Sequence, residues 1–160
     1  MRNEKAEVRY LQFVDAWYGL DAASARHFYP KAARLGLTRG QPRMLRFLGE
    51  NDGCRQKDIA EKFYIRAASV SGILSTMEKE GLIERKVNPD SRRETLVYLT
   101  ELGHEKRKEV MEMYRDLDQE VFAGFDDEDF NRLLELMGRI QDVMEDHSDG
   151  DTPQKELDIE

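Results

Sequence analysis

The pattern that decides the fold lies in residues 56–99, QKDIAEKFYIRAASVSGILSTMEKEGLIERKVNPDSRRETLVYL. The segment 56–63 predicts a short helix with an apolar inner face. A second helix is predicted over 67–80, because apolar residues recur there at the helical spacing i, i+3, i+4 and i+7. These are Val70, Ile73, Leu74 and Met77. After Gly81 the period changes to two, which predicts a β-hairpin with strands near 83–87 and 93–99.

The outer face of the second helix is small and polar. At about 100° per residue it holds Ala68, Gly72, Ser75 and Lys79 at its centre, with Ser69, Ser71 and Thr76 on its flanks. Two short helices followed by a hairpin predict a winged helix-turn-helix, in which the second helix can enter the major groove of DNA. The hairpin, or wing, would reach the flanking backbone or the minor groove.

Helical spacing also appears on both sides of this segment. We predict a first helix from Val8 to about Tyr29, broken by Pro30 and the region of Gly36, and a helix from Glu101 to about Phe122. A last helix follows the acidic start after Phe125. Thr38 and Gln41 form a capping-box pattern that predicts a further helix beginning there. The expected class is mainly α with a small β-hairpin wing, a winged helix-turn-helix core flanked by N- and C-terminal helices.

Charge is unevenly distributed along the 160 residues, which have 25 basic and 33 acidic side chains and a net charge of -8. Residues 146–160 contain six acids and one lysine, whereas residues 31–48 contain five basic residues and no acid. The middle of the chain is therefore basic, and a nucleic-acid partner stays compatible with the acidic total. The basic run 31–48 predicts either a solvated helix face or a track for the DNA backbone.

Several classes of protein are not expected. No apolar run approaches the roughly 18 residues of a membrane span, and no secretory signal precedes the first helix, so a cytoplasmic location is expected. Cys54 is the single cysteine, and His27, His104 and His147 are isolated, so no metal site and no cofactor are expected. No pattern of catalytic residues indicates an enzyme.

Motifs at separated places in the chain resemble the MarR family of bacterial transcription regulators. They are LTRGQ at 37–41, QKDIAE at 56–61, the run SVSGILSTMEKEGLIER at 69–85, NPDSRR at 88–93 and LVYLTELG at 96–103. The resemblance covers roughly Val8 to Met144. It implies a ligand-responsive repressor that binds an inverted-repeat operator as a homodimer. The implied partners are double-stranded DNA, a second copy of the chain and a small aromatic or anionic effector, with no membrane.

On this resemblance the chain is divided into four parts. They are an N-terminal dimerisation helix (1–36), a winged helix-turn-helix DNA-binding domain (37–100), C-terminal dimerisation helices (101–145) and an acidic disordered tail (146–160). The expected DNA-binding residues are Arg66, Ala68, Ser69, Ser71, Gly72, Ser75, Thr76, Lys79, Arg92 and Arg93. Long side chains for bidentate base contacts are absent from the second helix, so direct readout of bases is expected to be modest.

The sequence departs from the family's pattern at three places. The family's wing aspartate falls at Ser91 and its paired arginine at Arg93, but Asp90 can take the place of that aspartate from one residue earlier. This leaves open whether Arg92 or Arg93 enters the minor groove. Arg66 holds a helix-capping position that it cannot cap in the usual way, and a phosphate contact is the alternative. Gly72 either allows close approach of the helix backbone to DNA or marks a tolerant surface position.

The family's effector binds between the dimerisation helices and the DNA-binding lobe. The expected lining here is Tyr18, His27, Phe28, Tyr29, Met44, Phe47 and Tyr114, with His27 or Arg34 available to an anion. Ordinary core and dimer packing is the commoner role for aromatic residues of this region, and a ligand pocket is the alternative. Two other functions stay open, a metal-dependent repressor and an interaction module or antirepressor without DNA binding of its own. Cys54 lies far from the N-terminal position of the family's redox-sensing cysteine, so a redox switch is not expected.

Overall fold

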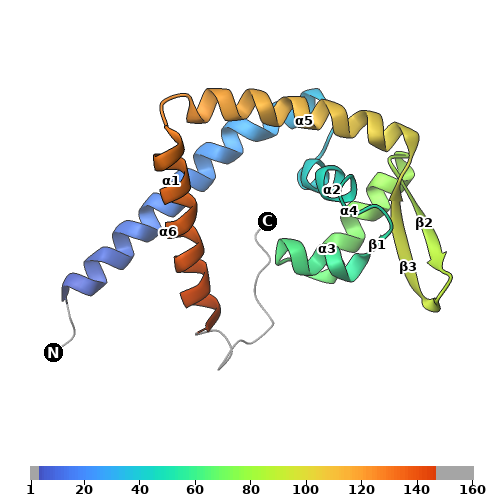
Figure 1. Ribbon diagram of the computed structural model, residues 1–160, viewed down its shortest axis with the longest axis horizontal. Helices are drawn as coiled ribbons and strands as arrows, with labels where there is room; N and C mark the ends of the chain where they lie inside the picture. The colour runs from blue at the N-terminus through green and yellow to red at the C-terminus, as the bar shows by residue number, and fades with distance from the viewer. Residues whose placement is uncertain (1–3, 147–160) are drawn as a thin grey trace. The chain divides into compact units, whose positions relative to one another are not determined.

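The computed structural model describes residues 4–146, with side chains described for 8–91 and 94–146. The fold is mainly helical with one small antiparallel sheet (Figure 1), as the sequence predicts. Along the chain the elements are α1 (Glu4–Arg34), α2 (Gln41–Leu48), β1 (Cys54–Arg55), α3 (Gln56–Phe63), α4 (Ala67–Lys79), β2 (Ile83–Asn88), β3 (Ser91–Leu99), α5 (Glu101–Phe122) and α6 (Asp127–Asp146).

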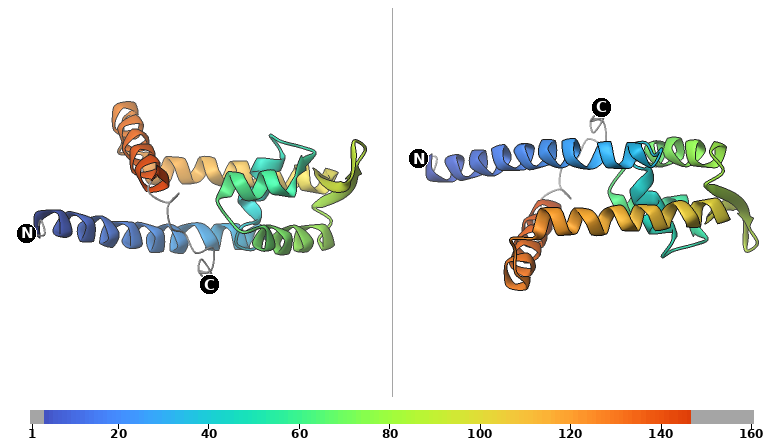
Figure 2. Two further views of the ribbon diagram at one scale, coloured as in Figure 1. Left: turned by 90° about the horizontal axis from the view of Figure 1, so that it is seen from below. Right: turned by 90° about the horizontal axis from the view of Figure 1, so that it is seen from above.

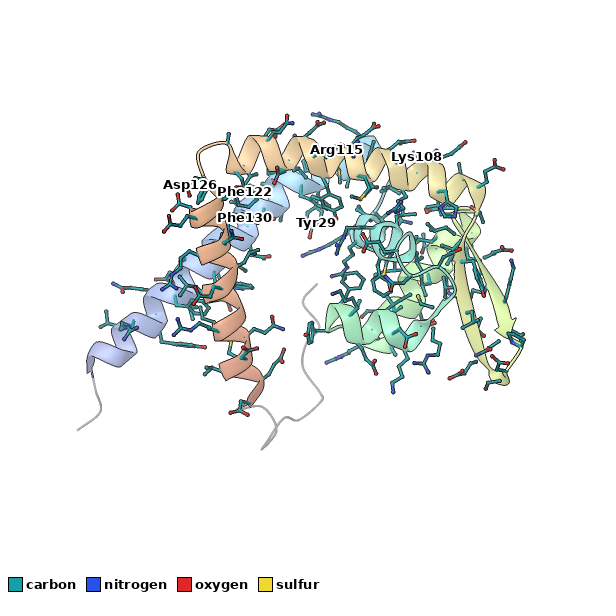
Figure 3. The ribbon with its side chains drawn as sticks, in the orientation of Figure 1. Tyr29, Lys108, Arg115, Phe122, Asp126 and Phe130 are labelled. Atoms are coloured by element: carbon teal, nitrogen blue, oxygen red, sulfur yellow. The ribbon has the colours of Figure 1, made fainter. Side chains whose placement is uncertain are left out.

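The chain divides within α5 into two compact units, one ending at Leu117 and the other beginning at Asp118. In the second unit, Phe122 packs edge-on against Phe125 and Phe130, with ring centroids 5.7 Å and 5.1 Å apart. Figure 3 shows Phe122 and Phe130 meeting beside Asp126. Asp126 Oδ1 accepts the backbone N–H of Asp129 at 2.8 Å, which satisfies a free donor in the first turn of α6.

The first unit contains the buried core. Val70, Leu74 and Met77 of α4 are fully buried, as their spacing predicts, while Ile73 is only partly buried against the same core. The other buried apolar side chains are Ala32, Leu37, Met44, Leu45, Phe47, Leu48, Ile59, Leu82, Ile83, Val97, Leu99, Val110 and Met113. The core thus holds α4 against the sheet and against α2, α3 and α5.

Pro30 does not end the first helix, so that half of the predicted break was wrong, whereas Gly36, with a φ of 74°, follows the end of the helix as predicted. α1 continues through Pro30 to Arg34. A proline within a helix removes one hydrogen bond, which costs about 3 kcal/mol in an exposed helix interior. Ala32, in the turn that follows, is 1% exposed and belongs to the core. Packing of Ala32 favours the helical turn after Pro30, in which Ala33 and Arg34 are exposed.

The capping box predicted at Thr38 forms one of its two bonds, because Gln41 accepts the backbone N–H of Thr38, but α2 itself begins at Gln41. Gly40 is the N-cap residue, and Pro42 lies in the first turn. Gln41 Oε1 accepts the backbone N–H of Thr38 at 2.7 Å, and Gln41 Nε2 donates to Glu80 Oε2 at 2.6 Å. The fully buried Gln41 therefore secures the turn before α2 and links it to the end of α4.

The sheet has three strands in the order β1-β3-β2, where the sequence predicts only a hairpin. β1, placed in a loop by the sequence pattern, pairs antiparallel with β3 through Cys54 opposite Val97 and Arg55 opposite Leu96. Two residues are too few to show a period of two, so this strand had no detectable pattern. Figure 2 shows β2 and β3 extending beyond α3 and α4.

The end of the described chain differs slightly from the predicted boundary of the acidic tail. Asp146 is the last residue of α6, and residues 147–160, where the disordered tail is expected, lie outside the described residues. Among residues 4–146, no helix has the length and apolar character needed to cross a membrane.

Candidate nucleic-acid interface

α4 begins after a tight turn from α3. Tyr64 ends α3 in the left-handed conformation, with a φ of 52°, and its side chain is 73% exposed. Arg66 is the N-cap residue of α4 in an extended conformation and makes no side-chain cap hydrogen bond. The sequence predicts that Arg66 cannot cap α4 in the usual way. Tyr64 belongs to no stretch of helical or strand period, so the sequence pattern did not indicate it as part of the site.

After α4 ends at Lys79, a turn at Gly81 leads the chain directly into the wing. The N–H of Gly81 donates to the carbonyl of Glu78 at 3.0 Å, and the N–H of Leu82 donates to that of Met77 at 2.9 Å. Gly81 has a φ of 73°, which a residue with a Cβ adopts only with strain. Because Leu82 and Met77 are both buried, this turn fixes where β2 leaves α4.

The outer face of α4 is largely open to solvent, as the sequence predicts. Ala68, Ser69, Gly72, Thr76 and Lys79 are exposed, and Ser71 and Ser75 are partly buried. Thr76 Oγ1 donates to the carbonyl of Gly72 at 3.2 Å. A Cβ built on Gly72 would meet no atom within 4 Å, so the fold itself does not require glycine there.

Arg85 is not among the DNA-binding residues that the sequence predicts. Its Nη2 donates to Ser75 Oγ at 3.3 Å, and its Nε lies 3.6 Å from Glu78 Oε2. Arg85 thereby joins β2 to two residues of α4. The alternation of β2 places Arg85 on the same side of the strand as buried Ile83. This alternation could have indicated that Arg85 faces the rest of the domain and not solvent.

The wing turns at Pro89 and Asp90, between paired Asn88 and Ser91. Asn88 Oδ1 accepts the backbone N–H of Asp90 at 3.0 Å, which closes the turn. Arg92 and Arg93 follow directly in β3, with side chains outside those described.

Part of the expected effector lining forms one aromatic cluster in the first unit. Phe28 stacks on Tyr114 with ring centroids 5.7 Å apart and contacts Tyr29 edge-on at the same distance. The guanidinium of Arg39 lies over Tyr29, 4.8 Å from the ring centre. Burial raises the pKa of the Tyr114 hydroxyl above its ordinary value.

The other expected lining residues have different environments. Met44 is fully buried in the core, and Phe47 is 9% exposed and packs against Phe63 with ring centroids 5.6 Å apart. Tyr18 is 68% exposed, and His27 is exposed. The structure thus brings Phe28, Tyr29 and Tyr114 together and gives Met44 and Phe47 a core position.

The basic run 31–48 contributes to this same region. Arg39 lies over Tyr29, and Arg43 lies over Phe63 at 5.3 Å from the ring centre. Arg46 and Arg43 both lie near enough to Tyr114 to oppose the rise in its pKa. The run is therefore not a uniform solvated stripe, since at least these side chains lie against aromatic rings.

Groups suited to metal or thiol chemistry do not gather at this interface. Within the described part of the chain, no cluster of three or more His, Cys, Asp or Glu side chains could hold a metal ion. Cys54 is half-buried, and burial raises the pKa of its thiol to about 11.

Comparison with known proteins relates the whole arrangement to bacterial regulators. The profile of the MarR family matches residues 35–94. The regulator FarR of Neisseria gonorrhoeae is 30% identical over 112 residues, which cover 70% of this chain and 68% of FarR. The homoprotocatechuate degradative operon repressor of Escherichia coli is 28% identical over 72% of this chain and 78% of the repressor. The regulator YdcH of Bacillus subtilis is 40% identical over 69 residues, 43% of this chain and less than half of YdcH.

Solved structures agree with the fold. A probable transcriptional regulator from Pseudomonas aeruginosa has a TM-score of 0.65 at 27% identity and covers 79% of this chain and 98% of its own. MepR of Staphylococcus aureus in complex with DNA has a TM-score of 0.73 at 18% identity, over 81% of this chain and 94% of MepR. The fold and its exposed α4 face define a winged helix-turn-helix transcriptional regulator. The chain belongs to the MarR family.

Proposed function

We propose that this protein is a repressor that binds an inverted-repeat DNA operator as a homodimer and is released by a small effector. The observation that carries the proposal is the exposed, small and polar face of α4, joined by a fixed turn to the wing. A helix with so few bulky side chains can lie close to base edges and phosphates in the major groove. The residues that contact DNA in this proposal are Arg66, Ala68, Ser69, Ser71, Gly72, Ser75, Thr76, Lys79, Arg92 and Arg93.

The dimer of the proposal is formed by α1, α5 and α6. These helices carry large apolar side chains that are exposed in the single chain, among them Trp17 of α1 at 51% and Leu134 of α6 at 51%. Exposed apolar side chains in such number favour burial against a partner. A twofold dimer would present two α4 helices about one turn of DNA apart, roughly 34 to 36 Å.

The effector of the proposal is an aromatic compound carrying an anionic group. The cluster of Phe28, Tyr29 and Tyr114 offers ring contacts, and Arg39 offers a cation beside them. One relative's name, a repressor of homoprotocatechuate degradation, favours an aromatic effector here. The effector would release DNA only by binding more tightly to the arrangement that cannot bind DNA.

Fluorescence anisotropy with the promoter DNA beside the protein's own gene tests this function. We expect selective binding over a scrambled duplex, weakening steeply as salt rises because phosphate contacts release counterions. Added phenolic acids should then lower this affinity and raise the midpoint of thermal unfolding. A folded dimer that binds neither duplex would contradict the proposal and favour an interaction module without DNA binding.

A further inference from the structure

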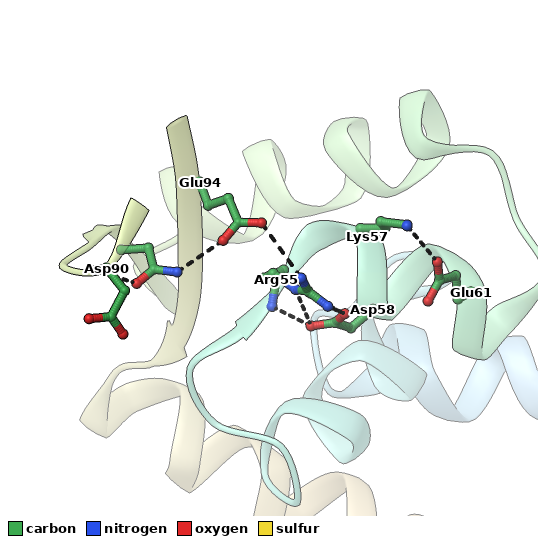
Figure 4. Close-up of polar contacts among 7 residues, drawn as sticks. Arg55, Lys57, Asp58, Glu61, Asp90 and Glu94 are labelled. Atoms are coloured by element: carbon green, nitrogen blue, oxygen red, sulfur yellow. Dashed lines mark hydrogen bonds and ion pairs between the residues drawn. The ribbon is translucent and has the colours of Figure 1, made fainter. Parts of the chain in front are cut away.

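A continuous set of polar contacts ties the turn of the wing to the start of α3 (Figure 4). The backbone N–H of Asp90 donates to Asn88 Oδ1 at 3.0 Å, and Asn88 Nδ2 donates to Glu94 Oε2 at 3.0 Å. The other carboxylate oxygen, Glu94 Oε1, lies 3.6 Å from Arg55 Nη1. We call the contacts of Asp90, Asn88, Glu94 and Arg55 the wing link.

The far end of the wing link is fixed in the first turn of α3. Arg55 donates from Nη2 and Nε to Asp58 Oδ1, at 2.7 Å and 3.1 Å, and its backbone N–H donates to Asp58 Oδ2 at 2.9 Å. Hydrogen bonds from Arg55 lower the pKa of Asp58 below its ordinary value. Arg55 is thus held in place at the junction of β1 and α3.

Glu94 lies between two groups that donate hydrogen bonds. The amide of Asn88 must direct its oxygen toward the N–H of Asp90, so its NH₂ group faces Glu94. On the other side, the guanidinium of Arg55 has donors only. An ionised carboxylate, which only accepts, satisfies both neighbours, whereas an uncharged amide would turn its own NH₂ group toward one of them.

We propose that Glu94 is a positioning residue for DNA binding, which holds the turn of the wing against α3 through Asn88 and Arg55. This inference rests on the proposed function. Arg92 and Arg93 precede Glu94 in β3, so the angle at which this segment meets DNA depends on the wing link. An acidic side chain with no such role would only repel the phosphates, and its removal would strengthen binding. The two roles therefore predict changes of opposite sign.

The first test compares Glu94→Gln with Glu84→Gln in the full-length dimer. Glu84 lies on β2 and pairs with Lys86 Nζ at 2.6 Å, outside the wing link, so both variants lose one negative charge from the wing. We expect Glu94→Gln to weaken selective binding to the promoter duplex roughly 3- to 10-fold, the range set by loss of the hydrogen bond with Asn88 or of the ion pair with Arg55. Glu84→Gln should bind equally or more tightly.

The second test reverses the direction of hydrogen bonding without changing net charge. In the double variant N88D/E94Q, the new carboxylate at position 88 can accept from both Asp90 and the new amide at position 94. The oxygen of that amide can then accept from Arg55, so every contact of the wing link is satisfied again. We expect its selective affinity to return to within about twofold of the wild type.

Affinities for promoter and scrambled duplexes, with thermal unfolding midpoints for each variant, decide the outcome. Equal or tighter selective binding by Glu94→Gln, or no recovery in N88D/E94Q, would overturn the wing link. A wild-type dimer that does not distinguish the two duplexes would overturn the proposed function and this inference together.

Discussion

Gly72 lies in the middle of α4, where glycine costs about 1 kcal/mol relative to alanine. A Cβ there would meet no atom within 4 Å, so the fold offers no reason for glycine. We expect Gly72→Ala to raise the free energy of unfolding by up to about 1 kcal/mol, measured by urea denaturation. If the helix backbone approaches DNA closely at this position, the same variant will bind the promoter duplex several-fold more weakly. Unchanged or tighter binding would indicate a tolerant surface position.

Cys54 is the residue whose chemistry depends most on its burial. With the pKa raised from 9.0 to about 11, the thiolate fraction at pH 8 falls roughly a hundredfold. We expect the rate of alkylation by iodoacetamide to keep rising with pH to about 11, because the thiolate is the reacting species. A rate that levels off near pH 9 would contradict a buried, unreactive thiol.

For single residues, the sequence predicts which side chains of α4 are exposed better than it predicts which residues they contact. Ala68, Gly72 and Lys79 are exposed as expected, because helical period alone decides the face on which a residue lies. The contacts of Arg85 with Ser75 and of Glu94 with Arg55 join residues on different elements. Such pairs depend on the tertiary packing, which a period cannot show.

The turn between α4 and β2 is the element junction on which the site depends most. Gly81 has a φ of 73°, a conformation that costs a residue with a Cβ about 1 to 2 kcal/mol. We expect Gly81→Ala to lower the free energy of unfolding by about that amount in urea denaturation. Gly124→Ala, between α5 and α6, is the control, because a Cβ there meets no atom within 4 Å. Equal effects of the two substitutions would contradict a strained turn at Gly81.

The boundaries of helices and strands show where sequence patterns fail. The spacing of apolar residues predicts α3, α4 and α5 closely, because each has one buried face. α1 passes Pro30, and Ala32 in the following turn packs in the core, a tertiary contact that the local proline signal does not show. β1 is stabilised by pairing with β3, a partner more than 40 residues away, and two residues leave no local pattern.

The proposed dimer depends on the exposed apolar side chains of α6. Leu133, Met137, Ile140 and Met144 repeat at helical spacing on this helix and are 37% to 47% exposed. We expect Ile140→Asp to weaken dimerisation at least tenfold in sedimentation velocity, because a carboxylate would be desolvated in an apolar interface. Asn131→Asp adds the same charge on the opposite, polar face of α6 and should leave the dimer intact. An unchanged dimer in Ile140→Asp would place the interface elsewhere.

In the proposed complex, two copies of the chain place two α4 helices on one operator. A footprint of the full-length dimer on the promoter DNA beside its own gene tests it most directly. We expect two protected half-sites of an inverted repeat, with centres about one helical turn, roughly 10 base pairs, apart. Protection of a single site without an inverted repeat, or no protection at concentrations where the protein is a folded dimer, would contradict it.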